Sequence, residues 1–369
     1  MCWEAYKETH AVRHAVIREV RKTLSCRSDR VFMYDCMECG KTVYQLLGCN
    51  SRLCNRCGKR YNDQWARSLA KSMFSVPHRH FVLSIPDILW PYLLADRKLW
   101  KAYMDSAIRT CNDYFPKIMR NPCIKPGVIA ILHPFGKDMN FKPHLHVIVT
   151  EGGFNGKGMF VPKTFFPARK FAKCWQYHVS AGLQQAGMPA CVFTELYRKY
   201  NGFYVWVHRA GTIRKPEDVA KYLGRYVRHP AIASSRITAF DGKTVGFFYE
   251  SEDGDGMKER HDVVMPVDGF ITSLIQHVPD SQFKMVRYYG AYARRRKAVY
   301  AGHAAQSGMA VRFQDILYMP GSRFKPRCPF CGGMLKKWGM QTIPPPGDYF
   351  HWEVKKETLA VWEIIGAGN

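Results

Sequence analysis

The sequence predicts an α+β protein with a central, mainly antiparallel sheet, flanking helices and a small cysteine-rich module before it. Three observations support this fold class. Segments with strand and helix periodicity alternate in the order strand, helix, hairpin, helix, strand. One of these strands carries a His-x-His pair, and two Cys-x-x-Cys pairs precede the first strand. A chain of 369 residues is long enough for two or three such units.

The net charge is the clearest compositional signal. Lys and Arg number 55 against 30 Asp and Glu, which gives a formal net charge of +25. An excess of this size predicts a polyanionic partner, with nucleic acid the first candidate and an anionic membrane the second. No apolar run reaches the ~18 residues of a membrane-spanning helix, and charged residues such as Arg13 and Glu19 interrupt any N-terminal secretory signal. We therefore expect no membrane partner and reduced cysteines.

The order of the elements follows from their periodicity. Apolar runs bounded by proline, glycine or aspartate predict strands at 80–86, 128–133, 142–149 and 203–207. Longer runs with helical spacing predict helices at 8–24, 61–75, 89–115, 168–186, 217–229 and 268–277. Turns at 134–138 and at Asp241-Gly242 predict two hairpins.

These elements suggest five segments. They are an N-terminal helix at 1–30, a zinc-binding ribbon with a linker helix at 31–74, the central domain at 75–236, a C-terminal α/β extension that contacts nucleic acid at 237–320, and a tail with a cysteine pair at 321–369. The boundaries lie where the periodicity changes or where proline and glycine interrupt it.

The first two cysteine pairs are each followed by glycine, which permits the tight turn of a zinc knuckle. Their spacing predicts one zinc ribbon in which Cys36, Cys39, Cys54 and Cys57 hold a structural Zn²⁺. Four thiolates leave no open coordination position for chemistry. Cys49 is a fifth candidate, which either replaces one of the four or is a bystander.

A third pair, Cys328 and Cys331, lies near the end of the sequence. It has no evident partner pair. It either binds a second Zn²⁺ with a distant ligand such as His351 or binds no metal.

The strand at 142–149 places His144 and His146 on the same face, because side chains two apart in a strand point the same way. The preceding hairpin turn brings His133 near them. Neutral imidazoles on rigid strands can form a divalent-metal site. The alternative is a solvated pair of strand histidines, which is the commoner outcome for a single His-x-His motif.

The helix predicted at 217–229 carries Tyr222 and Tyr226, which are four residues apart and share one face. Arg225 and Arg228 lie beside them. A phenol is a weak nucleophile, but a divalent ion on a phosphodiester would compensate for this, and attack would give a covalent phosphotyrosine. The alternative is that both tyrosines pack on the sheet.

Arginines near these motifs are candidates for nucleic-acid binding. In the stretch 287–297, aromatic residues alternate with basic ones, which suits stacking on bases together with phosphate contacts. A packed corner with a solvated basic rim would have the same pattern. The candidates are Arg52, Arg56, Arg225, Arg228, Arg236, Arg294, Arg295 and Arg296.

Taken in order, these motifs resemble the HUH (His-hydrophobic-His) endonucleases, and among them the two-tyrosine rolling-circle transposases of the insertion-sequence ninety-one type. The resemblance runs from about Tyr34 to Arg296. It rests on the cysteine pairs, on HRHFVLSIP, on LHPFGKDMNFKPHLHVIVTEGG, on YLGRYVRHPAIASSRI and on FKMVRYYGAYARRRK.

The resemblance implies a transposase that nicks and rejoins single-stranded DNA at transposon ends and target. His144 and His146, with His133 as third ligand, would bind Mg²⁺ or Mn²⁺. Tyr222 and Tyr226 would form 5′-phosphotyrosine links and leave a free 3′-OH. A host helicase is an implied partner, and a prokaryotic cytoplasm, close to the nucleoid, is the implied location. Lys142 departs from the aromatic residue or histidine expected before Pro143.

Two other functions fit the same motifs. A plasmid or phage replication initiator, or a relaxase, would use the same nick. Many of these carry a helicase, but the Gly-Lys-Thr sequences at Gly40 and Gly242 lack the earlier glycine of a P-loop, since Asp35 and Ile237 occupy that position. A zinc-ribbon DNA-binding protein without catalytic activity is the third possibility.

Overall fold

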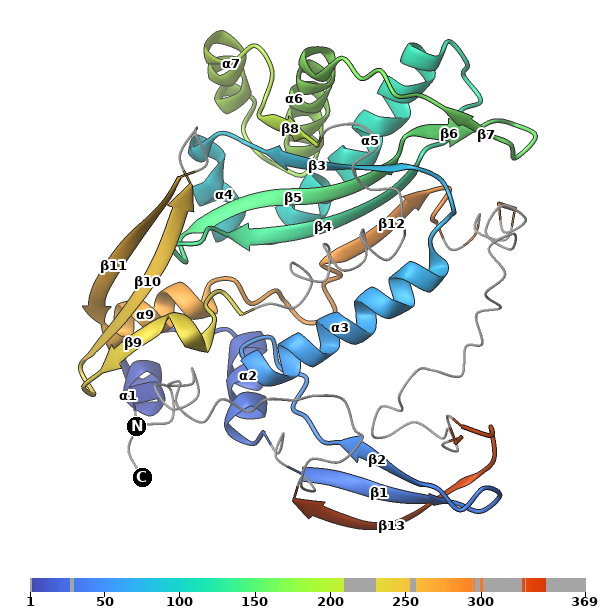
Figure 1. Cartoon of the computed structure of the whole chain (residues 1–369). Coiled ribbons are helices and arrows are strands. Elements are labelled where there is room, and N and C mark those ends of the chain that lie inside the picture. The colour runs from blue at the N-terminus through green and yellow to red at the C-terminus, as the bar shows by residue number, and fades with distance from the viewer. Residues whose placement is uncertain are drawn as a thin grey trace.

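The computed structural model describes residues 2–26, 30–208, 230–252, 257–293, 295, 299–300, 327–328 and 330–342. Its centre is a five-stranded sheet in the order β12-β4-β5-β3-β8, and every neighbouring pair is antiparallel (Figure 1). The predicted α+β class with a central antiparallel sheet is therefore confirmed. Within the described residues, no helix is both long and apolar enough to cross a bilayer.

Four of the five central strands coincide with predicted strands. The bounds are β3 (His78–Ser84), β4 (Gly127–Phe135), β5 (Phe141–Thr150), β8 (Val205–Val207) and β12 (Val286–Gly290). The edge strand β12 lies within the predicted extension, yet it pairs with β4. Its sequence, Val-Arg-Tyr-Tyr-Gly, has the basic and aromatic character of a binding loop, and only its long-range pairing places it in the sheet.

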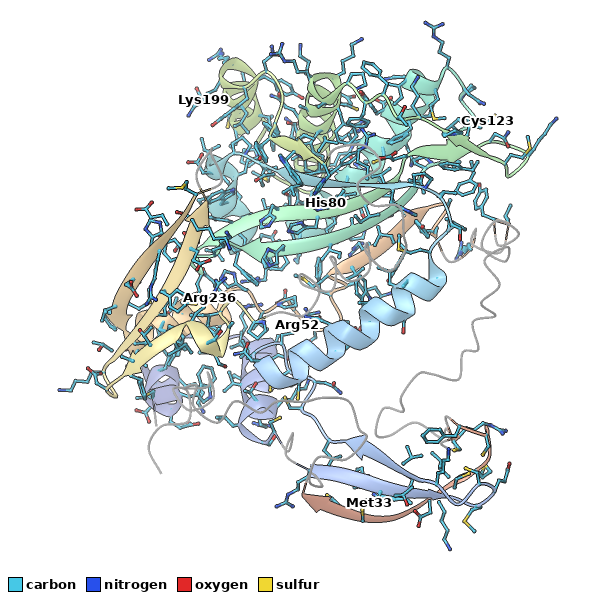
Figure 2. The ribbon with its side chains drawn as sticks, viewed as in Figure 1. Met33, Arg52, His80, Cys123, Lys199 and Arg236 are labelled. Carbon is cyan, nitrogen blue, oxygen red and sulfur yellow. The ribbon has the colours of Figure 1, made fainter. Side chains whose placement is uncertain are left out.

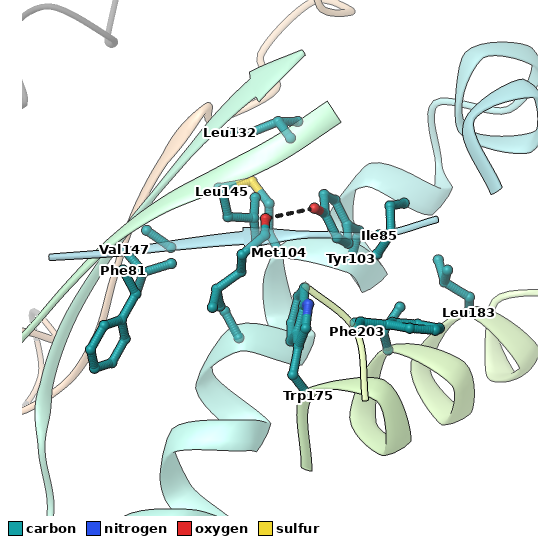
Figure 3. Packing of buried hydrophobic residues seen from close by; sticks show 14 of the residues in the cluster. Phe81, Ile85, Tyr103, Met104, Leu132, Leu145, Val147, Trp175, Leu183 and Phe203 are labelled. Atoms are coloured by element: carbon teal, nitrogen blue, oxygen red, sulfur yellow. Dashed lines mark hydrogen bonds between the residues drawn. The ribbon is translucent and has the colours of Figure 1, made fainter. Parts of the chain in front are cut away.

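Helices cover one face of this sheet (Figure 1). They are α4 (Trp90–Ala95), after the short turn η1 (Asp87–Leu89), then α5 (Leu99–Met119), α6 (Ala168–Gln185) and α7 (Ala190–Lys199). Leu145 and Val147 of β5 point towards Met104 of α5 and Trp175 of α6 in the largest hydrophobic cluster (Figure 3). The predicted helix at 89–115 is thus two helices, which separate at Asp96, and α7 was not predicted.

The opposite face of the sheet is apolar at one end only. Ile129, Ile131 and Ile148 pack there with Leu69 of α3 (Asn55–Ser72) and with Phe74. The small hairpin of β6 (Gly152–Phe154) and β7 (Phe160–Pro162) adjoins this cluster through Phe154 and Phe160. Because side chains alternate along β4 and β5, the same face continues beyond the isoleucines into the predicted histidines.

A second sheet joins β9 (Ile237–Phe240), β10 (Thr244–Glu252) and β11 (Lys258–Pro266). The expected hairpin is present between β9 and β10, where the Asp241 carboxylate accepts hydrogen bonds from the N–H groups of Lys243 and Thr244. This sheet shares a core with three helices, α1 (Cys2–Thr9), α2 (His14–Leu24) and α9 (Val267–Ile275). β11 was not predicted, and β10 extends to Glu252, into the stretch expected to be a loop.

A third sheet joins β1 (Arg30–Cys36) and β2 (Thr42–Leu46) to β13 (Leu335–Thr342), with β1 in the middle. The three strands lie below the rest of the chain in Figure 1. β13 belongs to the predicted tail, and all seven residues of β1 pair with it. The sheets therefore cross two of the predicted segment boundaries, because strands from the last third of the chain complete the central sheet and the N-terminal one.

A buried ion pair links β3 to the loop after β5. Arg79 Nε lies 3.1 Å from Glu151 Oε1, and their side chains are only 8% and 4% exposed. Replacing Arg79 with methionine leaves the carboxylate buried without this partner, so Arg79→Met should lower the free energy of unfolding by about 3–5 kcal/mol. Urea denaturation followed by tryptophan fluorescence measures this loss.

The control is Arg260→Met, which removes a 2.7 Å pair with Asp262 on the surface, where both side chains are more than half exposed. Water screens this pair, so the urea midpoint should barely change. Equal midpoints for the two variants would contradict the role of the buried pair.

Candidate metal centres and nucleic-acid interface

Three predicted histidines meet at one end of the central sheet. His133 lies on β4 opposite His144 on β5, and His146 follows on the same face. His133 Nδ1 is 3.1 Å from His144 Nε2, and one nitrogen from each of the three rings lies within 4.8 Å of the others. The structure thus brings together the three residues that the sequence suggested.

The surroundings leave these rings suited to bind a cation. His144 Nδ1 lies 2.7 Å from the Lys142 carbonyl oxygen, which can only accept, so Nδ1 carries the proton and Nε2 the lone pair. Burial lowers the pKa of His144, and burial together with the neighbouring histidines lowers the pKa of His146 well below its usual range. Neutral imidazole is the form that binds metals.

The spacing also fits a single ion. Two imidazole nitrogens bound to one ion at about 2.1 Å lie about 3 Å apart, close to the separation of His133 and His144. Without an ion, the same separation suits a hydrogen bond from His133 to His144. Three imidazoles accept several divalent metals and do not select one of them.

A fourth histidine, which the sequence analysis missed, lies against this group. His80 of β3 is fully buried, and its Nε2 is 3.0 Å from His146 Nδ1. Burial is the main reason that its pKa falls to about 3, so it is neutral. Its place in the second strand from β4 could be recognised only once β3 was paired with β5, because the register sets which histidines are neighbours.

The predicted tyrosine helix lies outside the described residues, and with it Tyr222, Tyr226, Arg225 and Arg228. The described residues on either side of it are informative. His208 donates its backbone N–H to the carbonyl oxygen of His80, and Pro230 lines a pocket together with His133. The chain therefore leaves and re-enters the described structure beside the histidine group.

Of the candidate arginines, Arg52 lies nearest to the histidines. It lines the pocket shared by His133 and Pro230, and its backbone N–H donates to Glu19 (Figure 2). Arg236 ends the short turn η2 (Ser234–Arg236), and Arg295 is exposed. Arg56 lies in α3, but its side chain is outside the description, as are Arg294 and Arg296.

The structure divides the cysteines into two groups, so the predicted single ribbon is wrong. Cys26, which the sequence analysis did not single out, lies 3.9 Å from Cys54 and 3.6 Å from Cys57 between sulfurs, and Cys49 completes this group. Tetrahedral thiolates at about 2.3 Å from Zn²⁺ lie about 3.8 Å apart, so the four sulfurs fit a structural zinc site.

Cys36 and Cys39 belong to a second group, with Cys328 and Cys331. The reason is the hairpin of β1 and β2. Its turn carries Cys36 and Cys39 to one end, whereas Cys49 and Cys54 follow β2 back to the other end, about 20 Å away along a seven-residue strand. The backbone N–H of Cys39 points at Cys36 Sγ and lowers the pKa of Cys36 to about 7. The suggestion that Cys328 and Cys331 use His351 or bind nothing is therefore replaced by this pairing of knuckles.

Comparisons with known proteins agree with both parts of this arrangement. Residues 1–85 match the family described as transposase zinc-binding domain, and residues 127–299 match the family described as putative transposase. A chain that combines these two domains defines a class, the DNA-processing transposases with an N-terminal zinc-binding module. This protein belongs to that class, in the insertion-sequence ninety-one type.

Two relatives support this assignment. The chain is 27% identical to the transposase for insertion sequence element IS801 of Pseudomonas savastanoi pv. phaseolicola, over 80% of this chain and 74% of the relative. It is 24% identical to the putative transposase y4qJ of Sinorhizobium fredii, over 79% of this chain and 78% of the relative. No solved structure matches the chain.

The first cysteine group makes Cys49 a ligand rather than a bystander. Serine binds zinc poorly in place of a thiolate, so Cys49→Ser should lose one equivalent of zinc per chain, measured by inductively coupled plasma mass spectrometry after gel filtration. Cys191→Ser is the control, since Cys191 is exposed and outside both groups. Unchanged zinc content in Cys49→Ser would return Cys49 to the role of a bystander.

Proposed function

We propose that this transposase works by a rolling-circle mechanism, in which it nicks and rejoins single-stranded DNA through 5′-phosphotyrosine intermediates on Tyr222 and Tyr226. His133, His144 and His146 would hold the divalent ion, Mg²⁺ or Mn²⁺. The substrates would be single strands at the transposon ends and at the target, exposed by a host helicase, since the chain has no P-loop motif of its own.

One observation carries the proposal. The three histidines converge at the end of the sheet where the chain departs at His208 and returns at Pro230. Only 21 residues, 209–229, lie between the described flanks, and they include both tyrosines. Two anchors beside the same cluster favour a short excursion that keeps the phenols close to a bound phosphate.

The proposed reaction is a balanced exchange of phosphodiester bonds. When bound, the ion would polarise the scissile phosphate. A tyrosine oxygen attacks phosphorus, its bond to the 3′ oxygen breaks, and the proton lost by the phenol ends on the released 3′-OH. A second 3′-OH then reverses the exchange and regenerates the phenol, so rejoining needs no external energy source. Two tyrosines allow two such transfers in succession.

The zinc-binding module would hold the DNA beside this centre. Its cysteine group of Cys26, Cys49, Cys54 and Cys57 would bind Zn²⁺ and fix the start of α3. Arg52, between Cys49 and Cys54 in sequence, lines the pocket next to His133. A guanidinium there can contact the phosphate that approaches the ion. Arg236 and Arg295 would extend the contact to the flanking strand.

The comparisons favour this function over the two alternatives. Both matched families and both relatives are described as transposases, whereas neither a replication initiator nor a DNA-binding protein without catalytic activity is among them. The last of these would also leave the histidine group unexplained.

The test is a covalent adduct. Incubated with Mn²⁺ and single-stranded DNA from the ends of its element, the unsubstituted chain should form a protein–DNA adduct that survives denaturing electrophoresis. Tyr222→Phe/Tyr226→Phe should form none, because phenylalanine has no oxygen to attack phosphorus. EDTA should also abolish the adduct.

The matched control is Tyr177→Phe/Tyr197→Phe, which changes two exposed tyrosines on the helices of the opposite face. This variant should form as much adduct as the unsubstituted chain. An undiminished adduct from the Tyr222→Phe/Tyr226→Phe chain would refute the proposed nucleophiles.

His80 would act in this mechanism as a positioning residue. If His146 Nε2 faces the ion, then His146 Nδ1 carries the proton and donates it to His80 Nε2 at 3.0 Å. That bond fixes both the tautomer and the orientation of His146. Partners of this kind behind metal-binding histidines typically change metal affinity by about 10- to 100-fold when they are lost.

His80→Ala should therefore weaken Mn²⁺ binding by about 10- to 100-fold in isothermal titration calorimetry, while excess Mn²⁺ restores adduct formation. His144→Ala should remain inactive at the same excess. His80→Gln should recover part of the affinity, since its amide oxygen can accept the bond from His146. If His80→Ala bound Mn²⁺ normally, His80 would have only a packing role.

A further inference from the structure

We infer that this chain binds a second structural zinc ion, held by Cys36 and Cys39 from the N-terminal module and by Cys328 and Cys331 from near the C-terminus. The two matched domains end at residues 85 and 299, so neither includes the second pair. The ion would fasten the end of the chain to its beginning.

The sulfur positions fit one tetrahedral ion. Cys36 Sγ lies 3.4 Å from Cys331 Sγ, and Cys39 Sγ lies 3.7 Å from Cys328 Sγ. These contacts join residues 295 and 289 positions apart in the sequence. All four sulfurs lie within 4.8 Å of one another, near the spacing of about 3.8 Å expected for four thiolates around Zn²⁺.

The two knuckles also have the same backbone structure. In each, the N–H of the glycine after the second cysteine donates to the carbonyl oxygen of the first, from Gly40 to Cys36 at 3.0 Å and from Gly332 to Cys328 at 2.9 Å. Both glycines have positive φ, +68° and +80°. This turn directs backbone N–H groups at sulfur, as in Cys39 to Cys36 and Gly333 to Cys331. Two matched knuckles facing each other form a zinc ribbon.

The third pair, Cys54 and Cys57, does not share this turn. Cys54 precedes the first residue of α3 and Cys57 lies in its first turn, so the backbone continues as a helix. This difference explains why Cys36 and Cys39 pair with the distant knuckle rather than with the nearer one.

Strand pairing supports the same connection independently of the sulfurs. β13 follows the C-terminal knuckle and pairs with β1 along its whole length, from Arg30 opposite Thr342 to Cys36 opposite Leu335. The zinc ligands thus lie at the end of a sheet that already brings the two segments into register. Because closing so long a loop costs conformational entropy, three short strands alone would hold it weakly, and an ion adds the missing stability.

Two disulfides are the other chemistry that four cysteines allow. Disulfide sulfurs lie about 2.05 Å apart, much closer than the observed contacts. Disulfides would also consume all four thiols without binding a metal, so metal content and thiol content together distinguish the two.

The experiment counts zinc in the full-length chain purified under reducing conditions. We expect two zinc ions per unsubstituted chain and one in Cys328→Ser/Cys331→Ser. Cys36→Ser/Cys39→Ser should also bind one, and so should the chain with all four substitutions, because both pairs hold the same ion. Cys123→Ser/Cys191→Ser, with two exposed cysteines outside both groups, should still bind two.

A zinc content that is unchanged in Cys328→Ser/Cys331→Ser would overturn the inference. So would a fall from one ion to none in Cys36→Ser/Cys39→Ser, since this is the result for a ribbon of Cys36, Cys39, Cys54 and Cys57. Where a variant aggregates, Co²⁺ substitution of the unsubstituted chain gives a second measure. Two equivalents with the intense thiolate-to-cobalt absorption of Cys₄ sites support two centres, and one equivalent refutes them. Neither result depends on DNA cleavage, so the inference can fail while the proposed function stands.

Discussion

The alternation of side chains along the hairpin of β4 and β5 is the constraint on which the rest of this structure depends. On one face, Leu132, Leu145 and Val147 build the core under α5 and α6. On the other face, the isoleucines near one end bind α3, and the histidines occupy the other end. A register shift of one residue would bury the imidazoles under the helices, so the same pairing that stabilises the fold also assembles the metal site.

The N-terminal module follows a similar logic at smaller scale. Its β1–β2 hairpin separates six cysteines into two groups at opposite ends, and each group recruits a ligand pair from elsewhere in the chain. One group fixes the start of α3, which packs beneath the central sheet. Arg52 and Leu53, beside that group, line the pocket shared with His133. The module therefore supports the candidate site directly.

Much of this could be predicted from sequence. Three of the central strands, the metal-binding hairpin and its three histidines have strong local signals, because a period of two and a short turn fix which residues are neighbours. The edge strand β12 and the ribbon strand β13 have no such signal. Their positions depend on partners far away in the sequence, as does the contact between His80 and His146. The tyrosine helix remains a prediction.

The sequence by itself determined the class of fold, the basic partner surface, the identity of the ligand residues and the family, since these depend on residue type and local spacing. Only the tertiary structure decided which cysteines share an ion and which histidine supports the metal-binding set. The physical reason is that a cysteine pair states its chemistry but not its partner. The turn geometry of Gly40 and Gly332, the direction of β1 and its pairing with β13 make that choice.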